Sequence, residues 1–240
     1  MSPLGDGTTS AADTLDAGKR IVDLSHPVTA GMVTYPGLPG PEISDHLSRA
    51  ESRRKYAPGT EFQIGRISMV ANTGTYLDAP FHRFGDGADL AAIPLSRVTD
   101  LEAIVVRGTH RAVGVGELAP HRAAVPGRAV LLHTGWDRHW GTPGYGAADH
   151  PFLTAEAIEW LVAQRPSIVG IDSVNIDDMA DGTRPAHTGL LAAGIPIVEH
   201  LTGLDRLPDR GFRFHAAPIA IAGMGTVSVR AYAVVPGDLG

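Results

Sequence analysis

One polar segment carries most of the information about this chain, and it reads Asn72-Thr73-Gly74-Thr75-Tyr76-Leu77-Asp78-Ala79-Pro80-Phe81-His82. In an extended segment the side chains alternate between two faces, so Asn72, Tyr76 and Asp78 point to the same side. The bend imposed by the proline lets Asp78 and His82 converge. This spacing fits a polar site at the end of a strand. It also fits a capped turn in which Asp78 binds backbone N–H groups.

Two further polar residues stand at the ends of predicted elements. His187 begins a predicted helix over residues 186–193, and Glu199 follows an apolar strand over residues 195–198. Proteins of the α/β class place ligands at the carboxyl ends of buried strands, which is where Glu199 stands. The alternative is a histidine at a helix start and a solvated glutamate with no joint function.

The remaining pattern mixes strands and helices. Thr154 is a predicted N-cap, which starts a helix that runs through Gln164. Residues 61–71 alternate between apolar and polar side chains, which predicts a half-buried strand. Further strands are predicted at residues 21–24, 101–107, 128–133, 168–171, 212–222 and 226–235, with a hairpin over residues 223–225 joining the last two.

The segment 72–82 resembles the signature of the cyclase family, His-x-Gly-Thr-His-x-Asp-x-Pro-x-His, a family that includes bacterial kynurenine formamidases and isatin hydrolases. The resemblance extends from about Ile21 to Val235. The signature residues retained here are Gly74, Thr75, Asp78, Pro80 and His82. Other matching stretches are Asp23-Leu24-Ser25, Tyr35-Pro36-Gly37, Thr134-Gly135-Trp136-Asp137, Trp140-Gly141-Thr142, Gly170-Ile171-Asp172, His187 with Leu190-Leu191, and Glu199 with Leu204.

The resemblance implies a fold and an assembly. We expect a single α/β domain of the swivelling β/β/α type with mixed sheets over residues 19–240. A flexible N-terminal arm over residues 1–18 is expected to precede it. The family resemblance further implies a homodimer or homotetramer.

The resemblance also implies roles for the polar residues. In the family the first two signature histidines and the Asp hold one divalent metal, and the same Asp with a later His and Glu holds a second. The last signature histidine transfers protons. Carried over by position, His82 is the proton-transfer residue, and Asp78, His187 and Glu199 are the ligands that remain for one Zn²⁺, Mn²⁺ or Mg²⁺.

This chain departs from the signature at its first two histidines, which are replaced by Asn72 and Tyr76. An amide oxygen and a phenol with a pKa of about 10 are poor substitutes for imidazole ligands. One cation on the remaining ligands and a metal-free hydrogen-bond network are therefore both open. Without a cation, repulsion between the two carboxylates raises one pKa, so that Asp78 or Glu199 pairs with His82 in acid–base chemistry. Tyr76 and Asn72 can then donate hydrogen bonds to a developing oxyanion.

Aromatic and histidine side chains in Gly/Pro-rich loops are candidates for a substrate pocket. We expect Trp136 and Tyr35 near the site, whereas Trp140 and Tyr145 are equally well interpreted as packing anchors. His26 and His215 flank the family matches, and each can either enter the pocket or serve an ordinary surface or core role. With Asn72, these residues are the predicted substrate-binding set.

Three functions remain open from the sequence. The leading hypothesis is a cyclase-family enzyme with a degenerate metal site, in which Asp78, Tyr76 and His82 perform acid–base chemistry. Its substrate would be a small cyclic or aromatic amide, lactam, lactone or polyketide-like molecule. The second is a mononuclear metal-dependent amidohydrolase that cleaves a C–N bond, and the third is a catalytically inactive metabolite-binding protein. Kynurenine formamidase activity itself ranks lower, because in this family it relies on the two missing histidines.

Composition excludes several other classes of protein. The chain has 240 residues, a net charge of −6, no cysteine and no extended cluster of Lys and Arg. A general nucleic-acid binder needs a basic face, and disulfides or thiolate metal sites need cysteine. No apolar run approaches the roughly 20 residues of a membrane helix, and no signal-peptide pattern precedes residue 19. We therefore expect a cytoplasmic enzyme with a small-molecule substrate, no nucleic-acid or membrane partner and no organic cofactor.

Overall fold

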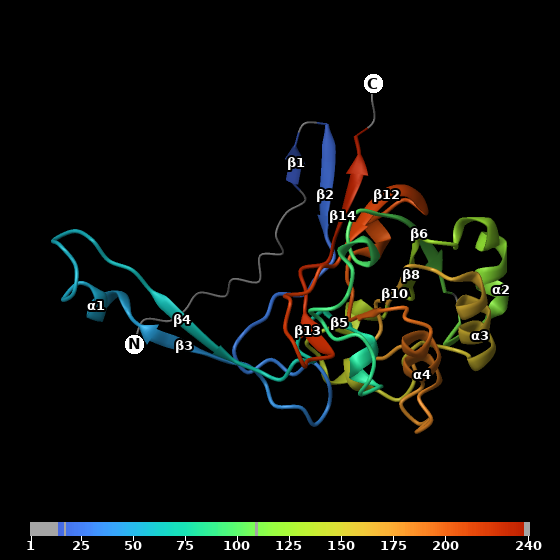
Figure 1. Ribbon diagram of the computed structural model, residues 1–240, viewed down its shortest axis with the longest axis horizontal. Coiled ribbons are helices and arrows are strands. Elements are labelled where there is room, and N and C mark those ends of the chain that lie inside the picture. Colours follow the sequence, from blue (N-terminus) through green and yellow to red (C-terminus); the bar gives the residue numbers. More distant parts are fainter. Residues whose placement is uncertain (1–13, 17, 109, 238–240) are drawn as a thin grey trace.

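A ten-stranded mixed sheet runs through the body of the molecule in the order β1-β2-β14-β12-β6-β8-β10-β11-β5-β13 (Figure 1). The computed structural model describes residues 14–16, 18–108 and 110–237 of the chain. In chain order the strands of this sheet are β1 (Thr14–Asp16), β2 (Lys19–Asp23), β5 (Tyr76–Asp78), β6 (Leu101–Arg107), β8 (Ala129–His133), β10 (Ile168–Ile171), β11 (Ile197–Glu199), β12 (Arg210–His215), β13 (Thr226–Ser228) and β14 (Tyr232–Pro236).

The central strands β6, β8, β10 and β11 are parallel, and the strands on either side of them pair antiparallel. These four strands are almost entirely buried, as expected for parallel strands covered on both faces. The predicted mixed α/β fold is therefore confirmed. The sequence locates β6, β8 and β10 to within a residue, because short apolar runs bounded by polar residues identify buried strands.

The two faces of the sheet contribute to two different cores. Along β6, Ile104 and Val106 pack with one apolar cluster, whereas Ala103 and Val105 pack with the other. This division follows from the two-residue period of a strand. The first cluster includes helix residues such as Leu161, and the second includes Phe212 and Phe214 of β12 together with residues of β2 and β14, because the sheet curls.

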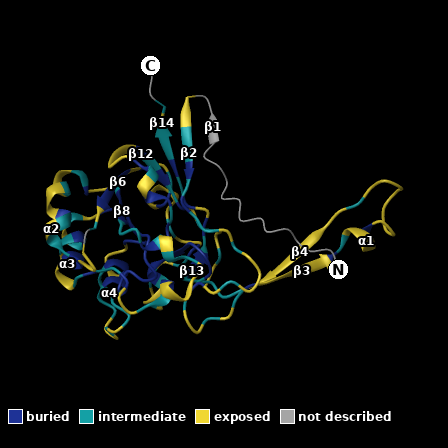
Figure 2. Ribbon diagram, turned by 180° about the vertical axis from the view of Figure 1, so that it is seen from behind, coloured by how far each residue is buried: buried dark blue, intermediate teal, exposed yellow. Residues whose placement is uncertain are grey.

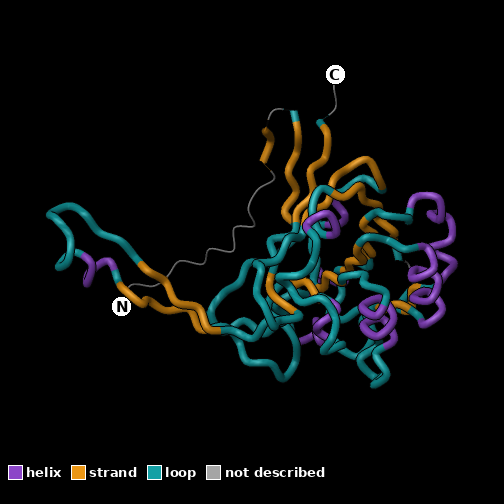
Figure 3. Tube along the Cα trace, in the orientation of Figure 1, coloured by secondary structure: helices purple, strands orange, loops and turns teal. Residues whose placement is uncertain are grey.

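The helices lie on one side of the curled sheet, apart from the short α1 (Arg49–Ser52) (Figure 3). They are α2 (Val115–Leu118), α3 (Ala155–Gln164) and α4 (Pro185–Ala192). The predicted helix start at Thr154 is confirmed, since its side chain accepts a hydrogen bond from Ala157 N. None of the described helices has the length and apolar composition to cross a membrane.

The N-terminal prediction falls mostly outside the described residues. Of the predicted flexible arm over residues 1–18, residues 1–13 and 17 are not described. Residues Thr14–Asp16 form β1, which pairs antiparallel with β2. A small parallel pair, β7 (Ala112–Val113) with β9 (Phe152–Leu153), completes the body.

Two sequence-based predictions are corrected by the topology. No hairpin over residues 223–225 joins β12 to β13, because β13 pairs with β5 and β12 pairs with β14 and β6. The alternating stretch 61–71 contains β4 (Ile64–Ser68), but every residue of β4 is exposed rather than half-buried. It pairs only with β3 (Glu42–Leu47), and the two strands project from the body (Figures 1 and 2). Alternation shows that one face is apolar, and only tertiary structure decides whether that face is covered.

The start of β13 lies directly against the chain at His82. A Cβ atom added to Gly225 would overlap the backbone of His82 and Phe81, so this position has room only for glycine. We expect Gly225→Ala to lower the free energy of unfolding by about 1–3 kcal/mol through overpacking. Urea denaturation measures this change. Gly116→Ala in α2 is the matched control, since no atom lies within 4 Å of its added Cβ, and equal stability of the two variants would contradict the close approach.

Candidate active site

The register of β5 brings four polar residues of the site together. In β5, Tyr76 stands opposite Glu199 of β11, and Asp78 stands opposite Thr226 of β13. Directly opposed residues share one face of a sheet, and so do residues two apart on a strand. The side chains accordingly meet: the Tyr76 hydroxyl donates to Glu199 Oε2 at 2.6 Å, and the Thr226 hydroxyl donates to Asp78 Oδ1 at 2.5 Å.

A short 3₁₀ turn over Pro80–His82 carries His82 back toward Asp78. His82 Nδ1 lies 3.7 Å from Asp78 Oδ1 and 2.7 Å from Thr226 Oγ1. The single hydroxyl proton of Thr226 is donated to Asp78, so His82 Nδ1 must donate to Thr226. This chain of hydrogen bonds leaves the lone pair of the His82 imidazole on Nε2.

His187 lies in the first turn of α4 and is held by a residue that the sequence did not reveal. Its Nδ1 lies 2.6 Å from Asp177 Oδ2, and Asp177 also accepts a hydrogen bond from Ala186 N. Asp177 therefore fixes both the start of α4 and the orientation of the imidazole. His187 Nε2 faces Asp78 Oδ2 at 3.7 Å and Glu199 Oε2 at 3.9 Å.

The donors around His187 fit a divalent cation. Ligands held at about 2.1 Å from one cation lie roughly 3–4 Å apart, which matches the separations from His187 Nε2 to the two carboxylates. Asp78 Oδ2 is buried and has no hydrogen-bond partner. His187 donates its other ring nitrogen to a carboxylate, as metal-binding histidines do. Asp78, His82 and His187 also place one donor atom each within 4.8 Å of one another.

Of the two residues that replace the signature histidines, Tyr76 joins a hydrogen-bond network, since it donates to Glu199. Asn72 lies near enough to Tyr76 to lower its pKa, which opposes the effect of burial. Burial, followed by the negative charge of Glu199, raises the pKa of Tyr76 well above its ordinary value. The phenol therefore keeps its proton, and that proton faces Glu199. The other oxygen of Glu199 accepts from Ile176 N at 2.7 Å.

Burial and neighbouring charges have opposite effects on the pKa values of His187, Asp78 and Glu199. Burial favours a neutral His187, but the hydrogen bond to Asp177 and the nearby carboxylates of Asp78 and Glu199 outweigh it and raise the pKa of His187 to about 10. Burial also opposes a charged Asp78, yet the nearby imidazoles of His187 and His82 and the hydrogen bond from Thr226 hold its pKa below the ordinary value. Burial raises the pKa of Glu199. In the metal-free protein His187 is thus an imidazolium among carboxylates.

A layer of aromatic and histidine side chains adjoins this cluster. His200 lies 4.9 Å from Tyr76, measured between ring centroids, and its Nδ1 lies 2.8 Å from the Tyr145 hydroxyl. His26 stacks on Trp140 at a centroid separation of 3.8 Å. The Nε2 atoms of His26 and His200 are buried and have no hydrogen-bond partner, which leaves two polar groups to be satisfied by a ligand or by water.

A cavity of about 680 Å³ lies beside this layer. It is lined by Gly31, Met32, Val33, Thr34, Pro36, Trp140, Gly141, Thr142, Pro143, Tyr145 and Gly146. The lining is mainly apolar and aromatic, as in pockets for small organic molecules. Trp140 and Tyr145 connect it to the histidines next to Tyr76.

Only some of the predicted substrate-binding residues lie at the site. Asn72 and His26 lie in the site, but Trp136 is buried and donates its indole N–H to the Tyr145 carbonyl, and Tyr35 packs in the same cluster. His215 does not reach the site: it stacks on Tyr232 and accepts from Asp100 N. Its strand, β12, is separated from β5 by β6, β8, β10 and β11.

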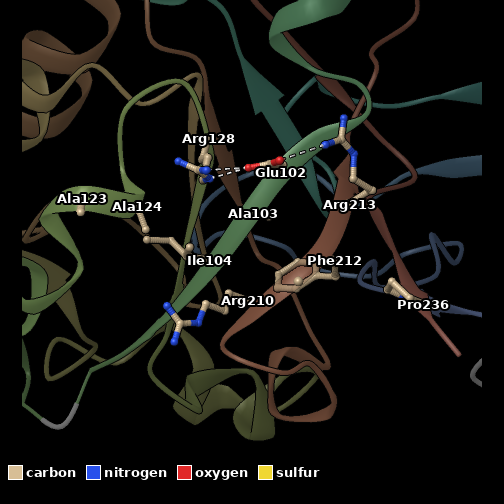
Figure 4. Close-up of a pocket in the computed structure, with 11 residues that line it drawn as sticks. Glu102, Ala103, Ile104, Ala123, Ala124, Arg128, Arg210, Phe212, Arg213 and Pro236 are labelled. Carbon is tan, nitrogen blue, oxygen red and sulfur yellow. Dashed lines mark hydrogen bonds and ion pairs between the residues drawn. The ribbon is translucent and has the colours of Figure 1, made fainter. Parts of the chain in front are cut away.

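Another cavity, of about 530 Å³, lies over β6 and β12, away from these residues (Figure 4). Glu102 crosses it to form ion pairs with Arg128 and Arg213. Two of its arginines thus have a carboxylate partner within the chain, and none of the predicted site residues lines it.

Sequence reasoning missed Asp177, Thr226 and His200, and it undervalued Trp140 and Tyr145. Asp177 sits in a polar segment with no fixed spacing to His187, and Thr226 is an unremarked strand residue until β13 is placed beside β5. One usable signal existed, because His200 directly follows Glu199 at the end of a predicted strand.

Comparison with known proteins places this geometry in a family. The model of the family described as "Putative cyclase" matches residues 22–178. The chain belongs to the cyclase family. It is 28% identical over 208 residues to a kynurenine formamidase of Erythrobacter litoralis, covering 85% of this chain and 88% of that protein.

Solved structures share the fold of this chain. The isatin hydrolase A of Labrenzia aggregata, bound to benzyl benzoate, superposes with a TM-score of 0.77 at 23% identity, covering 91% of this chain and 94% of that one. A protein described as a potential metal-dependent hydrolase with cyclase activity superposes with a TM-score of 0.73 at 24% identity, covering 90% and 98%. Kynurenine formamidases and isatin hydrolases are hydrolases, and we conclude that this chain is a hydrolase-like enzyme of the cyclase family.

The buried histidines of the layer predict a pH dependence of stability. Burial lowers the pKa of His200 to about 3 and, against the charges of Asp137 and Asp23, that of His26 to about 4. Below pH of about 6.5 the unfolded chain binds protons that the folded chain refuses, so acidification favours unfolding by up to about 1.4 kcal/mol per pH unit for each histidine.

His200→Asn tests this effect, because Asn tolerates the left-handed backbone (φ 57°) of residue 200. We expect the unfolding free energy of the variant to fall less steeply than that of the wild type between pH 6.5 and pH 5, as measured by urea denaturation. Burial raises the pKa of Asp172 to about 7, so acidification through this pH range stabilises the folded state through Asp172. This effect is the same in both proteins. The effect of His200 is therefore read from the difference between the two slopes of unfolding free energy against pH. Parallel slopes would show that His200 is not buried in its neutral form.

Proposed function

We propose that this enzyme hydrolyses the C–N bond of a small aromatic or cyclic amide with one divalent cation held by Asp78, His187 and Glu199. The observation that carries the proposal is the chain from His82 through Thr226 to Asp78, next to the unpartnered Asp78 Oδ2 that faces His187. The Thr226 hydroxyl links the proton acceptor, His82, to Asp78, which is a ligand of the proposed cation. Neighbours described as metal-dependent hydrolases support the metal.

The exposed fractions of the side chains distinguish the metal ligands from the proton-transfer residue. The side chains of Asp78 and His187 are 0% and 7% exposed, whereas that of His82 is 34% exposed. Buried donors suit ligation, and a half-exposed imidazole with its lone pair on Nε2 suits proton transfer to and from a substrate. We therefore assign His82 as the general base, although it also lies near enough to serve as a ligand.

A bound divalent cation would lower the pKa of a water molecule and polarise the amide carbonyl. His82 Nε2 takes a proton from the attacking water, and the water oxygen forms a bond with the carbonyl carbon. The C–N bond then breaks, and His82 returns the proton to the leaving nitrogen. Thr226 and Asp78 hold the His82 tautomer and stabilise its positive charge, so that the products are a carboxylate and an amine.

The substrate class follows from the cavity and from the relatives. Stacked rings such as His26 on Trp140 border an apolar space that suits a planar molecule. The free Nε2 atoms of His26 and His200 offer hydrogen bonds to its polar groups. One relative is named for a formamidase activity and one neighbour for the hydrolysis of isatin. These names support an aromatic formamide or an aromatic lactam.

A second candidate is metal-free acid–base catalysis, in which Tyr76 and Glu199 take part with His82. It is favoured by the raised pKa of His187, whose imidazolium balances the surrounding carboxylates without any cation. Cyclisation or dehydration suits such a site better than hydrolysis, since nothing then activates water.

Chelation separates the two candidates. We expect EDTA treatment to abolish hydrolysis of an aromatic formamide and an aromatic lactam, and Zn²⁺ or Mn²⁺ to restore it. Hydrolysis that survives complete removal of metal would instead support the metal-free candidate. Saturable binding with no turnover under either condition would indicate a metabolite-binding protein.

Thr226 offers a conservative test of the proton-transfer chain. Thr226→Val removes the hydroxyl at nearly constant volume, and we expect kcat to fall about 10–100-fold because the His82 tautomer is no longer fixed. Thr226→Ser keeps the hydroxyl and is expected to retain most of the activity. Steady-state kinetics of both variants, with metal content measured in parallel, checks the prediction; equal rates for the two would remove Thr226 from the mechanism.

A further inference from the structure

A groove over β6 and β12 lies apart from the residues assigned to the active site. Two cavities, of about 530 Å³ and about 300 Å³, make up this groove. They are continuous, because both are lined by Ile104, Ala123, Ala124 and Arg210. The larger cavity also reaches Pro236 at the end of β14 (Figure 4). We call this continuous space the β6–β12 groove.

Strand register sets three charged side chains in a row across the β6–β12 groove. Glu102 of β6 stands opposite Arg213 of the antiparallel β12. On its other side lies Arg128, because the next pair along the parallel strands β6 and β8 is Ala103 with Ala129. Facing residues of neighbouring strands share one face of a sheet. The Glu102 carboxylate accordingly lies 2.7 Å from Arg128 Nη2 and 4.0 Å from Arg213 Nη1 (Figure 4).

A β-bulge in β12 adds Arg210 to the same face. Arg210 stands opposite Ile104, which lies two residues from Glu102 on β6. On a regular strand, residues three apart such as Arg210 and Arg213 would point to opposite faces. The register shifts between Arg210 and Phe212, and Gly211 between them has a φ of 85°. Bulges of this kind redirect side chains, and here the bulge turns Arg210 toward the groove.

Arg210 brings a positive charge to the groove that no carboxylate of the chain balances. Among the residues that the structure describes, none forms a hydrogen bond or an ion pair with its side chain (Figure 4). The neighbouring Asp209 binds Arg107 instead, at 3.0 Å. Three arginines and two carboxylates line the groove, a net charge of +1, whereas the whole chain carries −6. The groove is thus a locally positive surface that attracts an anion.

The lining of the groove indicates which class of anion it fits. A guanidinium binds a carboxylate through two parallel hydrogen bonds. Glu102 and Asp209 lie close by, and their charges disfavour a dianion such as a phosphate ester. The rest of the larger cavity is mostly apolar, which suits a ring rather than a hydrated inorganic ion. Its apolar residues are Ala103, Ile104, Ala123, Ala124, Phe212 and Pro236.

We propose that the β6–β12 groove binds a small aromatic carboxylate, with the carboxylate on Arg210 and the ring against the apolar lining. Arg128 and Arg213 are already paired with Glu102 and border the site. This site is distinct from the cluster of Asp78, His187 and Glu199, and its tests do not depend on the proposed reaction.

Fluorine NMR of para-fluorobenzoate with the full chain tests the site. We expect saturable binding, and binding of the uncharged para-fluorobenzamide to be about tenfold weaker. Arg210→Gln should weaken binding of the benzoate about 5–10-fold and leave a cooperative melting transition. Arg97→Gln is the matched control, because Arg97 is also exposed and lines a different cavity; it should bind like the wild type.

Two results would overturn the proposal. The first is equal affinity for the benzoate in the wild type and in Arg210→Gln. The second is binding that is lost in His187→Ala and kept in Arg210→Gln, which would place the carboxylate at the active site.

Glu102 offers a test in the opposite direction. Glu102→Gln releases Arg128 and Arg213 from their carboxylate, and we expect the groove to bind para-fluorobenzoate about threefold more tightly or better. The affinity for para-fluorobenzamide should stay the same, because that ligand carries no charge. The same NMR titration measures both affinities. Unchanged or weaker binding of the benzoate in Glu102→Gln would show that the arginines of the groove do not receive the carboxylate.

Discussion

Three buried carboxylates share one imidazole, and the rest of the site depends on how their charge is balanced. Asp78 and Glu199 face Nε2 of His187, while Asp177 binds Nδ1. Buried carboxylates cannot remain charged together without compensation. The compensation here comes from the imidazole itself, from the proton that Tyr76 donates to Glu199 and from the Thr226 hydroxyl on Asp78. A divalent cation in place of the His187 proton would serve the same balance.

The sheet explains why this arrangement forms. β5 contributes only three residues, yet it lies between β11 and β13, so each of its inward side chains meets a partner from a distant part of the chain. Replacing the signature histidines at positions 72 and 76 has not emptied this face. Tyr76 fills it with a hydrogen bond to Glu199, and Asn72 lies beside Tyr76.

The sequence predicted what local patterns control. The spacing of Asp78 and His82 indicates their convergence because both lie in one short segment, and the N-cap at Thr154 is equally local. Other contacts are set by strand register and have no local signal in the sequence. Thr226 and Asp78, for example, are 148 residues apart. The exposed β4 was mispredicted for the same reason, since an amphipathic strand does not specify its neighbours. Of the two roles left open for His215, the structure shows a position remote from Asp78, stacked on Tyr232.

The most direct test measures metal content and turnover together in His82→Ala and His187→Ala, each loaded with Zn²⁺ and analysed by mass spectrometry. Our assignment predicts one metal ion per chain in the wild type and in His82→Ala, with turnover lost in the latter. It predicts loss of both metal and turnover in His187→Ala. A His82→Ala protein that loses its metal would make His82 a ligand rather than the base, and a wild type that binds no metal would contradict the proposed site altogether.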